Sequence, residues 1–212
     1  LSCYAKAQDY NYQFQDTTQT YISLVDSTKT QVSQFDDITK LPIGFTFNYA
    51  GKIIDSVSVR STGLLMFDTD NQYNFAFLSK DFVKDTENEN LLSSISYTVE
   101  SDSYGRNIMK IEFKNVMLVR GEEIIHLNFQ VWLHQFTNSV EFRMGIIEGT
   151  MPSENYLMGL INMNNTDVAS VGYLLSGNAA SPSPELISPQ GSLIELTSLP
   201  TNGTVYKFTP SN

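Results

Sequence analysis

The chain has 212 residues, of which 41% are hydrophobic, 12% are aromatic and only 17% are charged. This composition is typical of a single folded domain with a large apolar core, and it does not fit a disordered chain. The formal charge is −10, because 23 acidic residues outnumber 13 basic ones. Such an excess of acid repels a phosphate backbone, so nucleic acid is not an expected partner. No apolar run approaches the roughly 20 residues of a membrane-spanning helix.

The N-terminal segment carries the only cysteine, Cys3. Residues 5–7 (AKA) have the small-x-small spacing that signal peptidase prefers. We therefore interpret residues 1–7 as the remnant of a signal peptide and residues 8–212 as one β-sandwich domain. A lipid anchor on Cys3 and an extension without a targeting role are the alternatives. A mature chain without cysteine fits a bacterial envelope or extracellular protein, which predicts a secreted or outer cell-surface location.

Apolar and polar residues alternate with period two along most of the chain, and this pattern predicts β-strands separated by turns. The stretch 68–90 shows no steady period, so we expect a long surface loop with a helical turn there, and a second loop at 176–189. The expected strands, in chain order, are 11–15, 20–25, 41–49, 53–60, 64–67, 92–100, 107–118, 123–136, 140–147, 156–163, 168–175, 193–196 and 204–208.

About twelve such strands, at spacings near ten residues and with few helical patterns, predict an all-β fold. The expected architecture is an antiparallel two-sheet β-sandwich of jelly-roll or concanavalin-like type. No repeat of fixed period indicates a propeller or a solenoid.

The clearest predicted element is a β-hairpin at residues 125–147. One face of it is apolar and needs a second sheet to cover it. A turn centred on Thr137-Asn138 would place His134 opposite Glu141 and Trp132 opposite Arg143. The residues expected to point into the core are Ile125, Leu127, Phe129, Val131 and Leu133 before the turn, and Val140, Phe142, Met144 and Ile146 after it.

The other face of this hairpin carries the only tryptophan, Trp132. Its predicted neighbours are Gln130, His134, Glu141 and Arg143. An indole among such groups could stack a sugar ring and bind its hydroxyls, which makes these five residues a candidate ligand site. The alternative is ordinary packing, with Trp132 beneath a loop and capped by Arg143 through a cation–π contact.

One short segment suggests a metal. Asp68, Asp70 and Asn71 cluster oxygen ligands at the end of a strand, which is a candidate calcium site. The segment lacks the glycine and the terminal glutamate of an EF-hand loop, so a turn in which Asp and Asn bond their own backbone is the alternative. His126 and His134 are eight residues apart, roughly 26 Å along a strand, and cannot share a metal ion.

Catalytic motifs are missing from the sequence. There is no Gly-x-Ser-x-Gly elbow, no cysteine after residue 7 and no glycine-rich phosphate loop. Glu100 and Asp102 lack the further glutamate of a sandwich glycosidase motif. We expect Glu112 and Glu141 to form exposed ion pairs, with Lys110, Lys114 and Arg143 as partners. The sequence therefore predicts neither an enzyme nor a bound cofactor.

Four segments of the chain are informative together: 41–47 (LPIGFTF), 55–67 (DSVSVRSTGLLMF), 140–143 (VEFR) and 202–210 (NGTVYKFTP). They resemble the β-sandwich module that is common in secreted proteins of Bacteroidetes-type bacteria. The resemblance covers about residues 11–210 and extends, more distantly, to the nidogen-like domains of animal adhesion proteins. It implies secretion, often with a following C-terminal sorting domain for type IX secretion.

The function expected from these observations is that of a non-catalytic secreted or cell-surface module for adhesion or ligand binding. The ligand would be a glycan or another surface protein, met by loops at one end of the sandwich or by the face around Trp132. Two alternatives are a carbohydrate-active enzyme or its accessory domain, and a structural spacer.

Overall fold

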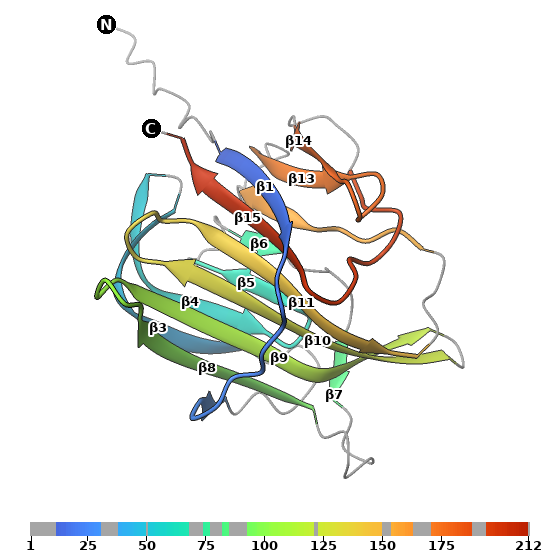
Figure 1. Cartoon of the computed structure of the whole chain (residues 1–212), viewed down its shortest axis with the longest axis horizontal. Helices are drawn as coiled ribbons and strands as arrows, with labels where there is room; N and C mark the ends of the chain where they lie inside the picture. The colour runs from blue at the N-terminus through green and yellow to red at the C-terminus, as the bar shows by residue number, and fades with distance from the viewer. Residues whose placement is uncertain are drawn as a thin grey trace, which may run out of the picture.

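The computed structural model describes residues 12–30, 38–49, 51–67, 74–76, 82–84, 93–120, 123–149, 154–162, 171–187 and 194–211. These residues form fifteen β-strands and no helix, and the strands pair antiparallel in two sheets (Figure 1). The predicted all-β, two-sheet architecture is confirmed, whereas its jelly-roll or concanavalin-like connectivity stays a prediction. The predicted signal-peptide remnant lies outside the described residues.

The first sheet is built around the predicted hairpin. Its middle is the run β8–β9–β10–β11, in which each strand pairs with the next along the chain. In spatial order its strands are β1 (Tyr12–Thr18), β15 (Thr204–Pro210), β11 (Val140–Glu148), β10 (Glu123–His134), β9 (Asn107–Arg120), β8 (Ser94–Ser101) and β2 (Thr28–Lys29), with β7 (Phe82–Lys84) paired to the second half of β9.

The second sheet lies behind the first and covers its apolar face (Figure 1). Four strands follow one another along the chain, and three later strands extend the sheet beyond β6. Its order is β14 (Ser183–Ile187), β13 (Val171–Ser176), β12 (Gly159–Asn162), β6 (Asn74–Ala76), β5 (Leu64–Met66), β4 (Lys52–Arg60) and β3 (Ile38–Tyr49).

The core is the aromatic and aliphatic layer between the two sheets. Phe113 and Phe129 stack with ring centroids 4.4 Å apart, and the ring of Tyr49 in the second sheet lies 4.6 Å from that of Phe67. Burial of such rings is the main source of stability in a domain of this kind. All five residues of β10 that were expected to point inward are fully buried: Ile125, Leu127, Phe129, Val131 and Leu133.

The pairing of β10 with β11 differs from the predicted register by two residues. Both predicted cross-strand pairs are wrong, because Trp132 lies opposite Glu141 and Arg143 lies opposite Gln130. The turn occupies residues 135–138, so its centre lies one residue earlier than predicted. Its last residue, Asn138, has a left-handed backbone with φ of 50°. A shift of two residues leaves every side chain on its predicted face, since the side-chain period is two.

A β-bulge changes the inward parity near the other end of the hairpin. Leu127 pairs with Ile147 and Phe129 pairs with Met144, so β11 carries one extra residue between these two pairs. The bulge brings Ile147 against the core and leaves Ile146 53% exposed. The expectation that Ile146 points inward is therefore wrong.

Several short elements also differ from expectation. The stretch 68–90, expected to be a loop, contributes β6 and β7, and the expected loop 176–189 contributes the edge strand β14. The expected strand at 20–25 is an irregular segment, and the one at 193–196 reduces to an isolated bridge at Leu196. Strands of three residues are too short for a period to show in the sequence.

The stacked pair in the core gives a stability prediction. Phe113→Ala should lower the free energy of unfolding by about 3–5 kcal/mol, because it removes a fully buried ring and leaves a cavity against Phe129. Urea denaturation measures this loss. Phe136→Ala is the matched control, since that ring is 76% exposed and its removal should cost less than about 0.5 kcal/mol. Equal losses in the two variants would contradict the described core.

Candidate functional site

A segment of the chain crosses the outer face of the first sheet. Because β1 and β2 lie at opposite edges of this sheet, residues 19–27, here called the strap, must run over the strands between them (Figure 1). The ring of Tyr21 packs on Gly145 of β11, where an added Cβ would lie 2.9 Å from the ring. The outer face of the sheet is therefore covered where the strap crosses it.

The strap is held by a buried carboxylate on β9. Glu112 is only 2% exposed, and it accepts a hydrogen bond of 2.8 Å from the Tyr21 hydroxyl and two longer ones from the Leu24 amide. Gln130 donates to the same carboxylate at 2.9 Å and to the Ile22 carbonyl at 2.8 Å. The predicted exposed ion pair of Glu112 is wrong, because the strap closes over it and supplies neutral donors.

The contact also changes the acidity of the phenol. Burial of Tyr21, together with the adjacent Glu112 carboxylate, raises the pKa of the phenol well above its usual value. The hydroxyl therefore remains protonated at any physiological pH and acts as a hydrogen-bond donor to Glu112.

The five residues predicted as a ligand site form one connected network on β10 and β11. The Trp132 indole N–H donates to the Gln130 side-chain oxygen at 2.8 Å, and the Arg143 guanidinium lies 3.9 Å from the indole ring centroid. Lys110 lies 4.4 Å from the same centroid. Two cations on one indole is the packing that the cation–π alternative describes.

Glu141 lies at the centre of this network. Its carboxylate contacts Arg143 at 2.9 Å, Lys207 at 3.0 Å and the Nε2 of His134 at 3.1 Å. The histidine approaches at an angle that does not make a good hydrogen bond. Burial of Glu141 acts against its ionisation, but the adjacent His134 and Lys207 outweigh it and lower the pKa of the carboxyl to about 2. Glu141 is therefore a permanent anion that binds three bases.

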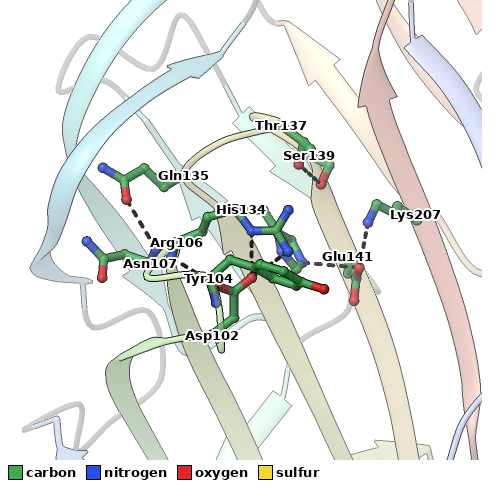
Figure 2. A network of polar contacts seen from close by, with 10 residues as sticks. All are labelled: Asp102, Tyr104, Arg106, Asn107, His134, Gln135, Thr137, Ser139, Glu141 and Lys207. Atoms are coloured by element: carbon green, nitrogen blue, oxygen red, sulfur yellow. Dashed lines mark hydrogen bonds and ion pairs between the residues drawn. The ribbon is translucent and has the colours of Figure 1, made fainter.

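A pocket of about 250 Å³ lies beside this network, at the end of the first sheet. Two neighbouring hairpin turns form its walls, residues 102–106 between β8 and β9 and residues 135–138 between β10 and β11, and Figure 2 shows their side chains converging. Its lining residues are Asp102, Arg106, Asn107, Ile108, His134, Gln135, Phe136, Thr137 and Lys207, and we call it the hairpin-end pocket.

The first of these turns is organised by one carboxylate. Asp102 accepts hydrogen bonds from the backbone amides of Tyr104 at 2.8 Å and Arg106 at 3.0 Å, and two nitrogens of the Arg106 guanidinium lie 2.6 Å from its other oxygen. The hydrogen bonds from Arg106 and Tyr104 lower the pKa of Asp102 to about 2. The guanidinium lies 4.8 Å from the ring centroid of Tyr104, which is 80% exposed.

The second turn is tied to its surroundings on two sides. The backbone amide of Gln135 donates to the backbone carbonyl of Asn107 at 3.0 Å, and the backbone amide of Asn107 donates to the side-chain oxygen of Gln135 at 3.1 Å (Figure 2). The side chain of Asn138 accepts a hydrogen bond of 2.8 Å from the backbone of Asn48 in the second sheet. The pocket is therefore pre-organised by the backbone, while Phe136 at the turn is 76% exposed.

The sequence pattern that defines the family described as NIDO related matches residues 11–210. The chain belongs to the NIDO-related family. The match covers nearly all of the chain and confirms the distant resemblance to nidogen-like domains. No curated protein and no solved structure matches the chain.

The predicted residues of this NIDO-related domain are brought together, but most of them are not accessible. Gln130, Glu141 and Arg143 are buried. Only His134 lines the hairpin-end pocket, with its ring 6.3 Å from that of Trp132. Sequence reasoning missed four residues of the pocket and its rim: Tyr104, Arg106, Phe136 and Lys207. A signal existed for two of them, because a turn residue between alternating strands is exposed and an aromatic side chain there has no core to fill.

The proposed metal ligands Asp68, Asp70 and Asn71 lie outside the described residues of the NIDO-related domain. Within the described part, no group of three or more His, Cys, Asp or Glu side chains could hold a metal ion. The same part contains no helix that is long and apolar enough to cross a membrane.

The carboxylate under the strap gives a second prediction. Glu112→Ala should lower the free energy of unfolding by about 1–3 kcal/mol, because it leaves buried donors of Tyr21 and Gln130 without an acceptor. Hydrogen exchange of the Leu24 amide should become faster in this variant. Glu100→Ala is the control, since that side chain is an exposed ion-pair partner of Lys110. Unchanged exchange at Leu24 would show that Glu112 does not hold the strap.

The low pKa of Glu141 gives a pH dependence. The carboxyl titrates near 4.5 when unfolded and near 2 when folded. Its contribution to stability is therefore complete above about pH 5 and is lost as the pH falls toward about 2, with a size on the order of 3 kcal/mol. Urea denaturation of wild type and Glu141→Gln should show a gap that is largest above about pH 5 and closes toward about pH 2. A gap that does not depend on pH would contradict the ion cluster.

Proposed function

We propose that this NIDO-related domain is a non-catalytic module for adhesion or ligand binding that acts outside the cell, and that it binds a glycan at the hairpin-end pocket. The observation that carries the proposal is the pair of exposed aromatic rings, Tyr104 and Phe136, on the two turns that enclose the pocket. Aromatic faces beside convergent polar groups are typical of sugar-binding sites.

The state of the carboxylates supports a non-catalytic role. A glycosidase needs two carboxyl groups at a fixed separation, one of them protonated to act as a general acid. Near the pocket, the pKa values of Asp102 and Glu141 are both lowered to about 2, and both groups are bound by bases. A carboxyl that remains ionised at every working pH cannot donate a proton. Two further acids lie in this region: Glu112 is enclosed beneath the strap, and Glu100 is ion-paired to Lys110.

The location outside the cell rests on the sequence. The small-x-small segment 5–7 and the resemblance to secreted β-sandwich modules of Bacteroidetes-type bacteria support it, and a type IX sorting domain after the module is part of the same proposal. A β-sandwich that presents a pre-organised loop pocket suits adhesion or surface assembly, since rigid scaffolds place binding groups on their connecting turns. A surface protein is the second candidate ligand, because both exposed rings could also serve as anchors in a protein interface.

Glycan-array binding tests the proposal. The chain should be retained on at least one glycan, and Tyr104→Ala and Phe136→Ala should each weaken binding by about threefold to tenfold through loss of a stacking ring. Leu186→Ala is the matched control, because this exposed apolar residue on β14 lies in the second sheet. Melting temperatures should be unchanged in all three variants.

Other outcomes would redirect or reject the proposal. Loss of binding in Trp132→Ala alone would move the site to the face around that residue. Release of reducing sugar ends from a retained glycan would favour the carbohydrate-active enzyme. Retention of no glycan at all would reject glycan binding and leave a protein ligand or a structural spacer.

A further inference from the structure

We infer that the hairpin-end pocket selects an acidic sugar, one whose ring carries a carboxylate, over its neutral counterpart. The inference rests on the proposed glycan binding and adds the chemical class of the ligand. The observations behind it are the surplus of cations around the pocket and the donors that they leave available.

The charge at the pocket is opposite in sign to that of the whole chain. Arg106 and Lys207 line the pocket with one carboxylate, Asp102, whereas the chain as a whole carries a formal charge of −10. Glu141 and Arg143 directly behind the pocket add one acid and one base. These three cations and two anions leave a net charge of +1. A positive region on an acidic protein attracts anions specifically to that region.

The cations keep donors for a ligand. Within the described residues, the Arg106 guanidinium uses its Nε and Nη2 atoms on Asp102, while its Nη1 atom makes no hydrogen bond to protein. The side chain of Arg106 is 45% exposed. Lys207 gives one of its three N–H groups to Glu141 at 3.0 Å and remains 30% exposed. Arg and Lys donors toward one carboxylate form charge-assisted hydrogen bonds, which are stronger than bonds to a sugar hydroxyl.

The remaining features suit a sugar ring and not a free small anion. A volume of about 250 Å³ accommodates one ring. Gln135 and Thr137 lie in the same lining. The Gln135 oxygen already accepts from the Asn107 amide and the Thr137 hydroxyl pairs with Ser139, which leaves the Gln135 side-chain N–H groups and one further position on the Thr137 hydroxyl for ring hydroxyls. The Arg106 guanidinium covers one face of the Tyr104 ring, so a sugar ring would stack on the opposite face and its carboxylate would reach the guanidinium past the edge of the phenol. The turn at residues 102–106 thus offers an aromatic ring for the sugar and a guanidinium for its carboxylate.

Matched sugar pairs test this inference. Isothermal titration of the intact chain should compare trigalacturonate with its methyl ester, and sialyllactose with the methyl ester of its sialic acid. In at least one pair the acid should bind about tenfold or more tightly, because a charge-assisted bond is lost in the neutral partner. The preference should shrink when salt is raised from about 50 mM to about 500 mM, since the partners are exposed enough to be screened.

Three variants separate a specific contact from general attraction. Lys207→Gln and Arg106→Gln should each remove most of the preference for the acid, measured as the ratio of the two affinities, acid over neutral sugar, within the same variant. Arg106→Lys should restore only part of it, because the ammonium lacks the planar fork. Lys114→Gln is the control, because it removes the same charge from an exposed position outside the pocket. Lys114 lies seven residues after Asn107 of the pocket lining, roughly 23 Å along β9, so this variant should leave the preference intact.

The outcomes distinguish this inference from the proposed function. Equal binding of acid and neutral sugars, or preference for the neutral ones, would overturn the inference while glycan binding stands. An acid preference that persists in both Lys207→Gln and Arg106→Gln would also overturn the inference, since the pocket would then not be the source of the preference. If no sugar on the array or in these pairs binds, both the inference and the proposed function fail.

Discussion

Side-chain alternation in β9, β10 and β11 is the constraint on which the rest of this domain depends. Every second residue of β10 from Ile125 to Leu133 is apolar and fully buried against the second sheet, so the residues that alternate with them must lie on the outer face. Those residues include Gln130, Trp132 and His134. The polar layer is thus a direct consequence of the core, and its composition determines what can cover the sheet. A change of parity in these strands would exchange the core with the polar layer.

The position of β1 and β2 at opposite edges adds a second constraint. The strap that joins them closes over the polar layer, and a buried polar group without a partner is costly, so each of these groups must find one. Glu112 finds Tyr21, Leu24 and Gln130, while Glu141 finds three bases. The inner face of the central strands is therefore covered by apolar contacts, and the outer face is partly covered by the strap over a polar network in which both buried carboxylates have partners.

The sequence was sufficient for the fold class and for the inward face of the hairpin, because both follow from a period of two. It was not sufficient for the register, which depended on a four-residue turn. Nor was it sufficient for the inward position at Ile147, because the bulge between Met144 and Ile147 selects one of two adjacent isoleucines of equal hydropathy. The five residues of the network around Trp132 were predictable, because all of them lie on one face of one hairpin. The burial of this network was not, because the strap residues that contact Gln130 and Arg143 lie 108 and 124 positions earlier in the chain.

The same covering explains why the accessible chemistry lies at the end of the sheet. The strap closes the outer face over Glu112 and Gly145, but the turns at 102–106 and 135–138 lie beyond it and are held by their own backbone hydrogen bonds. Rigid turns can expose aromatic side chains at little entropic cost, since their backbone is already ordered. The buried network contributes from behind, because Glu141 holds Lys207 and His134 at the wall of the pocket. The residues predicted as a binding face thus act as the support of a neighbouring site.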